Sequence, residues 1–111
     1  MTTGMGATPA ISVVICAYTE DRWAPLVAAV ESVRAQTLAA REIIVVIDHN
    51  PRLLGRVRER FPQITTIENS GPQGLSGARN CGVAVAKGEI IAFLDDDASA
   101  EPAWLAQLAT G

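Results

Sequence analysis

The sequence predicts an α/β domain built on a parallel, Rossmann-like sheet. Short apolar segments alternate with segments of helical periodicity, in the order βαβαβαβα. The strand segments are continuous apolar runs, which are typical of strands buried on both faces under helices. The chain has 111 residues, 49% of them hydrophobic, which is enough for one domain, or part of one, with a real core.

Four segments rich in β-branched residues are the predicted strands. They span residues 11–17, 42–48, 64–68 and 89–94, and turn-forming residues separate them from their neighbours. Four helices are predicted between and after them, at 21–33, 53–61, 76–86 and from 102 onward. Asp21 is placed to cap the first helix, and Pro62 stops the second.

Composition excludes several classes of function. The net charge of −3 offers no basic surface for nucleic acid. No apolar run is long enough to cross a bilayer, and residues 1–10 form a flexible tail without the features of a signal peptide. Cys16 and Cys81 lack metal or redox spacing, so we expect two reduced thiols. A cytoplasmic location is therefore predicted, with any membrane association made through regions outside this chain.

Polar residues follow each predicted strand at its carboxyl end. They are the segment 18–21, Asp48, the segment 69–79 and the triplet 95–97. Because ligands of parallel sheets bind outside the carboxyl ends of the strands, these segments are expected to converge on one site.

The aspartate triplet is the strongest functional signal. Like charges this close repel each other unless a cation neutralises them. If the strand alternation continues, Asp95 and Asp97 face one way, where they suit Mn²⁺ or Mg²⁺, with Asp97 the better candidate ligand. Asp96 faces the other way and could accept hydrogen bonds from ribose hydroxyls. The alternative is a solvated loop in which one aspartate caps the next helix.

The other polar segments admit two interpretations each. The glycines of 71–77 let a backbone approach an anion before a helix, although a plain loop has the same composition. Asp48 could accept a pyrimidine ring N–H or simply form a turn. Tyr18 could stack on a base or cover the core. Arg79, in the first turn of the predicted helix, is unfavourable beside the helix dipole, which indicates a role in the pocket, against a phosphate or the carboxylates. His49 is interpreted as a turn residue.

Four stretches together resemble the N-terminal, nucleotide-sugar-binding half of a family 2 glycosyltransferase with the GT-A fold. They are 11–18 (ISVVICAY), 32–37 (SVRAQT), 74–82 (GLSGARNCG) and 88–97 (GEIIAFLDDD). The resemblance implies that residues 11–111 form a partial, truncated donor-binding domain.

The resemblance also implies residue roles. The base is held by Cys16, Ala17 and Tyr18, with Glu20 close by, and its edge is read by Asp48. The pocket is lined by Gly74, Arg79 and Asn80, and Asp95 and Asp97 hold the divalent metal on the donor diphosphate. The second strand departs from the family pattern, since Ile47 replaces an acid and His49-Asn50 replace Gly-Ser.

The family activity is an inverting transfer of sugar from a nucleotide diphosphate sugar to an acceptor hydroxyl. The acceptor, whether a saccharide, a lipid-linked compound or a small molecule, is not identified by the sequence. The family's general base belongs to a second half that this chain lacks, so we expect the chain alone to be inactive. Two alternatives are a stand-alone nucleotide-binding module and a sugar-phosphate nucleotidyltransferase.

Overall fold

A computed structural model describes residues 8–110. The strands are β1 (Ile11–Ala17), β2 (Glu42–Asp48), β3 (Thr65–Asn69) and β4 (Ile90–Asp95). The helices are the 3₁₀ turn η2 (Glu20–Arg22), α1 (Trp23–Arg34), α2 (Pro51–Arg60), α3 (Leu75–Val85) and α4 (Trp104–Thr110). Every predicted strand and helix is present with its boundaries within two residues, and the predicted fold class is confirmed.

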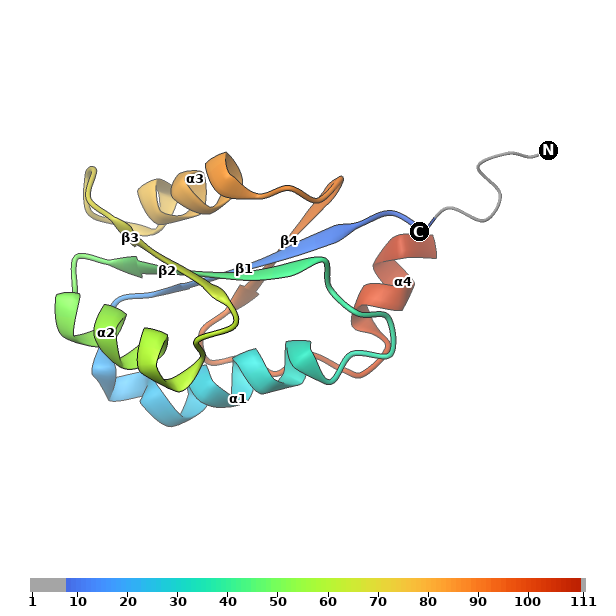
Figure 1. Cartoon of the computed structure of the whole chain (residues 1–111), viewed down its shortest axis with the longest axis horizontal. Coiled ribbons are helices and arrows are strands. Elements are labelled where there is room, and N and C mark those ends of the chain that lie inside the picture. Colours follow the sequence, from blue (N-terminus) through green and yellow to red (C-terminus); the bar gives the residue numbers. More distant parts are fainter. Residues whose placement is uncertain (1–7, 111) are drawn as a thin grey trace.

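The four strands form one parallel sheet in the order β3-β2-β1-β4. The chain winds outward from β1 through β2 to β3 and then returns to place β4 on the other side of β1. Right-handed crossovers therefore put α1 and α2 on one face of the sheet and α3 on the other (Figure 1). The order reverses between β1 and β4, and such a reversal opens a crevice at the carboxyl ends of the two strands.

The core is unequal on the two faces of the sheet. The larger cluster joins β1 and β2 to α1, α2 and Leu105 of α4, and it includes the fully buried Ile15, Val30 and Leu53. On the other face the buried cluster of residues 8–110 is small and consists of Val14, Ile44, Val46 and Ala78. Gly82 lets α3 lie close to the sheet there.

Helix α3 crosses β1, β2 and β3 but leaves the same face of β4 largely uncovered. Phe93 of β4 is consequently 40% exposed. Among the described residues, no helix is both long enough and apolar enough to traverse a bilayer.

The start of the first helix differs from the prediction. Asp21 is not its cap: the hydroxyl of Thr19 accepts a hydrogen bond from the Asp21 N–H and caps η2 instead. Helix α1 then begins at Trp23 without a side-chain cap. The short 3₁₀ turn takes up the polar residues that were expected to begin the helix.

Of the predicted tail, residues 1–7 lie outside the described residues. Ala10 is attached to the start of β4, because its carbonyl accepts hydrogen bonds from the N–H groups of Glu89 and Ile90. The boundary between tail and domain stays a prediction.

Candidate functional site

A pocket of about 520 Å³ lies at the carboxyl ends of β1 and β4. Nine of the eleven predicted site residues line it: Cys16, Ala17, Tyr18, Asp48, Gly74, Arg79, Asp95, Asp96 and Asp97. Segments that follow all four strands thus reach the same region, as expected for the rim of a parallel sheet. Their functional roles stay predictions.

The aspartates of the triplet occupy three different environments. Strand β4 ends at Asp95, and the chain then turns, with the Ala98 N–H donating to the Asp95 carbonyl at 3.1 Å. Asp95 and Asp97 are exposed, whereas Asp96 is only 6% exposed. Asp95 and Asp97 both line the pocket from exposed positions, but the chain turns after Asp95 and does not continue as a strand. Their pairing as metal ligands stays a prediction.

Asp96 is a buried carboxylate with incomplete partners. Its Oδ1 lies 3.4 Å from Nη1 of Arg22, while its Oδ2 has no hydrogen-bond partner among the described residues. Burial raises the pKa of this carboxyl; Arg22 acts in the opposite direction, and Asp97 adds to the rise. An unpartnered buried oxygen costs free energy, so a donor group supplied by a ligand would stabilise it.

The acidic rim fits a hard divalent cation only with help from a ligand. Among residues 8–110, no group of three or more His, Cys, Asp and Glu side chains is arranged to hold an ion by itself. Asp95 and Asp97 nonetheless present exposed carboxylate oxygens at the pocket, and Mg²⁺ commonly takes one or two carboxylates and completes its shell with water and substrate phosphates. The residues present fit that mode of binding.

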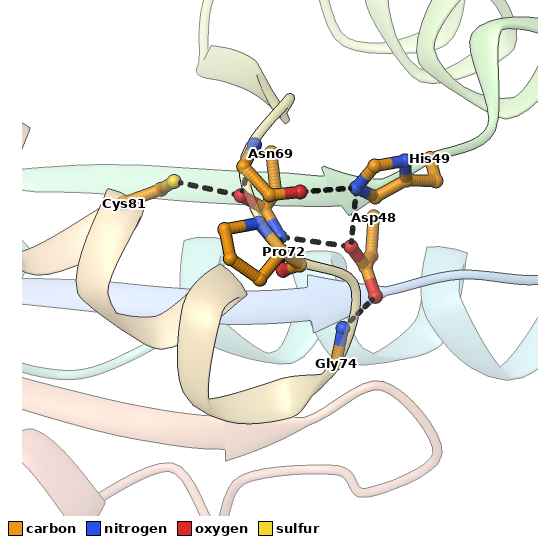
Figure 2. Close-up of polar contacts among 7 residues, drawn as sticks. Asp48, His49, Asn69, Pro72, Gly74 and Cys81 are labelled. Atoms are coloured by element: carbon orange, nitrogen blue, oxygen red, sulfur yellow. Dashed lines mark hydrogen bonds and ion pairs between the residues drawn. The ribbon is translucent and has the colours of Figure 1, made fainter.

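Asp48 is oriented from two sides at the end of β2. Its Oδ1 accepts a hydrogen bond from Nδ2 of Asn69 at 2.9 Å, and its Oδ2 accepts one from the Gly74 N–H at 2.9 Å (Figure 2). Each carboxylate oxygen keeps a further acceptor position. The carboxylate is therefore held in place and can still accept a hydrogen bond from a ligand.

His49 does form a turn, in a conformation that is unusual for its residue type. Its φ of 53° lies in the left-handed region. The ring Nε2 lies 2.6 Å from the carbonyl oxygen of Gly71, which can only accept, so this nitrogen carries the proton (Figure 2). His49 does not line the pocket, and its contact attaches the end of β2 to the glycine-rich loop.

The pocket also has two aromatic rings in its wall, each with an arginine beside it. The ring of Tyr18 is exposed, and Arg22 lies over it at 5.5 Å. Arg79 lies 5.2 Å from the centre of the Phe93 ring. Burial raises the pKa of the Cys16 thiol to about 11, so this side chain stays neutral in the pocket. Arg79 is in the second turn of α3 rather than the first.

Two predicted residues are not brought to the pocket. Glu20 instead lies within 3.6 and 3.7 Å of nitrogens of Arg56 and Arg52 on α2. Asn80 is on α3 next to Arg79 but is exposed and does not line the pocket. Successive residues on a helix point in different directions, which is why Arg79 reaches the pocket and its neighbour does not.

Arg22 and Asn69 contact the site but are not among the individual residues that the sequence predicted for it. Arg22 lines the pocket beside Asp96, and its position five residues after β1 in a polar segment was an available signal. Asn69 is buried at the end of β3, where a polar residue directly opposite Asp48 in the parallel register could have been noticed.

The fold and the site define a class: Rossmann-like α/β domains that take a ligand at the switch point of a parallel sheet. Comparison with known proteins narrows it. The model of glycosyl transferase family 2 matches residues 12–110. The chain therefore belongs to glycosyl transferase family 2, as its sequence motifs predicted.

Two named relatives agree with this assignment. A glucosyl-dolichyl phosphate glucuronosyltransferase of Haloferax volcanii is 37% identical over 101 residues, covering 88% of this chain and 32% of the relative. The Escherichia coli glucosyltransferase WfaP, named as acting on α-D-GlcNAc-diphosphoundecaprenol with UDP-Glc, is 36% identical over 92 residues, with 78% and 35% covered.

The crystal structure of S. aureus TarS in complex with UDP-GlcNAc matches with a TM-score of 0.73 at 22% identity, covering 91% of this chain and 30% of TarS. This likeness confirms the expected GT-A type of fold. The chain spans about a third of the length of these proteins.

Proposed function

We propose that this chain is the donor-binding part of an inverting glycosyltransferase and binds a nucleotide diphosphate sugar together with Mn²⁺ or Mg²⁺. The observation that carries the proposal is the convergence of Tyr18, Asp48 and the aspartate triplet on one pocket. The flat aromatic side chain and the held carboxylate suit the base of such a donor, and the acidic rim, with a metal ion, suits its diphosphate.

The nucleoside end of the donor fits the β1–β2 side of the pocket. Tyr18 is 56% exposed and offers its face to the base. Asp48 has acceptor capacity left for a ring N–H, which favours a uracil-like edge. The unpartnered Oδ2 of Asp96 would accept a hydrogen bond from a ribose hydroxyl and so recover the cost of its burial.

The charges of the pocket support a requirement for metal. Four aspartates line it against two arginines, Arg22 and Arg79, so negative groups outnumber positive ones by two. A diphosphate would be repelled by this surplus unless a divalent cation accompanied it. Asp95 and Asp97 are the residues that would hold the ion. The chemistry that such an ion supplies when bound is neutralisation of charge on the departing diphosphate.

Sugar transfer also needs a base that deprotonates the acceptor hydroxyl. The acidic side chains at the pocket are already engaged with Arg22, Asn69 and Gly74 or assigned to metal. We therefore propose that these 111 residues bind the donor without transferring its sugar. The base and the acceptor site would belong to a second half of the same domain, in a cytoplasmic enzyme. Detectable transfer by the purified chain would contradict this.

Isothermal titration with UDP-sugars, with and without Mn²⁺, tests the proposal. Binding should require the metal, Asp97→Asn should weaken it strongly, and Asp96→Asn should weaken it less. Glu59→Gln, which removes an exposed carboxylate on α2 away from the pocket, is the charge-matched control. Equal, small effects of the three substitutions would show that the triplet is a solvated loop. Preferential binding of a nucleoside triphosphate would favour a nucleotidyltransferase instead.

A further inference from the structure

The side chain of Asn69 is the most fully engaged polar group near the pocket. It is 1% exposed. Its amide nitrogen donates to Oδ1 of Asp48 at 2.9 Å and to the carbonyl of Pro72 at 3.0 Å. Its amide oxygen accepts from the Gly71 N–H at 3.1 Å and from the thiol of Cys81 at 3.2 Å. All four hydrogen-bonding positions of the amide are used.

These contacts join two strands, one helix and the glycine-rich loop (Figure 2). Asn69 ends β3, Asp48 ends β2, and Cys81 belongs to α3, while Gly71 and Pro72 belong to the glycine-rich loop. The amide can adopt only one orientation, because the reverse would set its oxygen against the Asp48 carboxylate and the Pro72 carbonyl. A fully satisfied buried network of this kind fixes its members rigidly.

The loop is held tightly from the side of α3 as well. A Cβ added at Gly77 would lie 2.6 Å from the Pro72 oxygen and 3.2 Å from Nδ2 of Asn69. The same loop supplies the Gly74 N–H that binds the second oxygen of Asp48. Asn69 thus orients one oxygen of Asp48 directly, by its hydrogen bond to Oδ1. It orients the other oxygen indirectly, because it holds the loop whose Gly74 N–H binds Oδ2.

We propose that Asn69 is a positioning residue of the donor site, which holds the Asp48 carboxylate and the glycine-rich loop in the arrangement that receives the nucleoside. This inference rests on the proposed function. Asn69 does not line the pocket, so it acts through Asp48 and Gly74 rather than by touching the donor. It differs from a purely structural residue because its loss would impair donor binding more than it impairs folding.

The substitution Asn69→Asp tests this role with a minimal change of shape. A carboxylate would replace the amide donor and face Asp48 at hydrogen-bond distance. Two carboxylates this close hold one proton between them at lower pH, and that proton restores the donor. The other titratable or charged groups around the network are His49, 3.8 Å from Asp48, Cys81, Cys16 and, beside Cys16, Arg79. All four are present in the parent chain, so the ratio to the parent cancels their titration.

Thr66→Val is the matched control on the same strand. Thr66 is buried in β3, and its hydroxyl has no partner among the described residues. Valine keeps the shape and removes only that hydroxyl. For both variants we would measure the dissociation constant for a UDP-sugar with Mn²⁺ from pH 8 to pH 5.5 and express it as a ratio to that of the parent chain. Urea unfolding would report the stability of each variant, and amide exchange would report the order of the loop at Gly71 and Gly74.

We expect Asn69→Asp to bind about tenfold or more weakly at pH 8, since a hydrogen bond to a charged group is lost, and to recover toward the parent value at pH 5.5. Amide exchange at Gly71 and Gly74 should quicken in this variant only. Thr66→Val should bind within about twofold of the parent. Parent-like binding by Asn69→Asp at every pH, or an equal loss in Thr66→Val, would overturn the inference.

The two proposals fail separately. If the parent chain binds no nucleotide sugar, the proposed function is wrong, and the positioning role is then judged by exchange alone. Unchanged exchange at Gly71 and Gly74 in Asn69→Asp overturns it, and faster exchange at these two amides supports it.

Discussion

Replacement of Gly82 by alanine tests how closely α3 packs against the sheet. A Cβ at this position would lie 2.6 Å from Cγ1 of Val14 and 3.3 Å from Cγ2 of Val46. Carbon atoms pack best at about 3.5–4.0 Å, so the helix or the valines must move by about 1 Å. Both valines are fully buried in the central strands β1 and β2 and have little room to yield.

The magnitude follows from two opposing contributions. Overpacking of a core costs about 1–3 kcal/mol, and alanine recovers up to about 1 kcal/mol of helix propensity, so Gly82→Ala should lower the free energy of unfolding by about 1 kcal/mol. Gly55 is a matched control in α2, because a Cβ there meets no atom within 4 Å. Gly55→Ala should therefore stabilise the fold by about 0.5–1 kcal/mol.

Urea unfolding of the two variants measures the difference directly. We expect Gly55→Ala to be more stable than the parent and Gly82→Ala to be less stable. If the two variants are equally stable, the close contact of α3 with Val14 and Val46 is not a constraint on the sequence, and the reasoning is refuted.

Two further predictions concern pH. Burial raises the pKa of the Glu42 carboxyl, but hydrogen bonds from the Ser12 hydroxyl and the Lys87 N–H outweigh this and leave it lowered. The stabilising contribution of Glu42 is therefore present above the ordinary carboxyl pKa and is lost as the pH falls through the lowered pKa. Glu42→Gln should lower the free energy of unfolding at pH 7 and make it depend less on pH in acid. Urea unfolding at a series of pH values measures both effects. The pKa of Asp96 is raised, so the parent chain loses stability as the pH rises from the ordinary carboxyl pKa through the raised value. The free energy of unfolding of Asp96→Asn, relative to the parent, should therefore increase over that interval. A difference that stays constant with pH would contradict this.

The fold was predictable because its signals are local. Each strand is a continuous apolar run, and each helix has a stripe at helical spacing, so β1 and β2 were located to the residue. The convergence of Tyr18, Asp48 and the aspartate triplet followed from topology, because the carboxyl ends of parallel strands share one rim.

The features that the sequence did not predict depend on contacts that only the folded chain brings about. Thr19 and Asp21 are both good caps, and only the 3₁₀ turn decides between them. Arg22 reaches Asp96 across 74 residues of chain, which no local pattern encodes. Asn69 looked like an ordinary loop residue until the register placed it opposite Asp48.

The unequal core has a consequence for how ligand binding affects stability. Because few buried apolar side chains lie between α3 and its face of the sheet, hydrogen bonds such as those of Asn69 and Asp48 carry more of the attachment there than they do on the other face. Helix α3 carries Arg79 and is preceded by the glycine-rich loop, so one wall of the pocket belongs to the side of the sheet with the smaller apolar core. A ligand that contacts both this wall and β4 would link α3 to the edge strand that it leaves uncovered. Binding of such a ligand would therefore raise the free energy of unfolding of the domain.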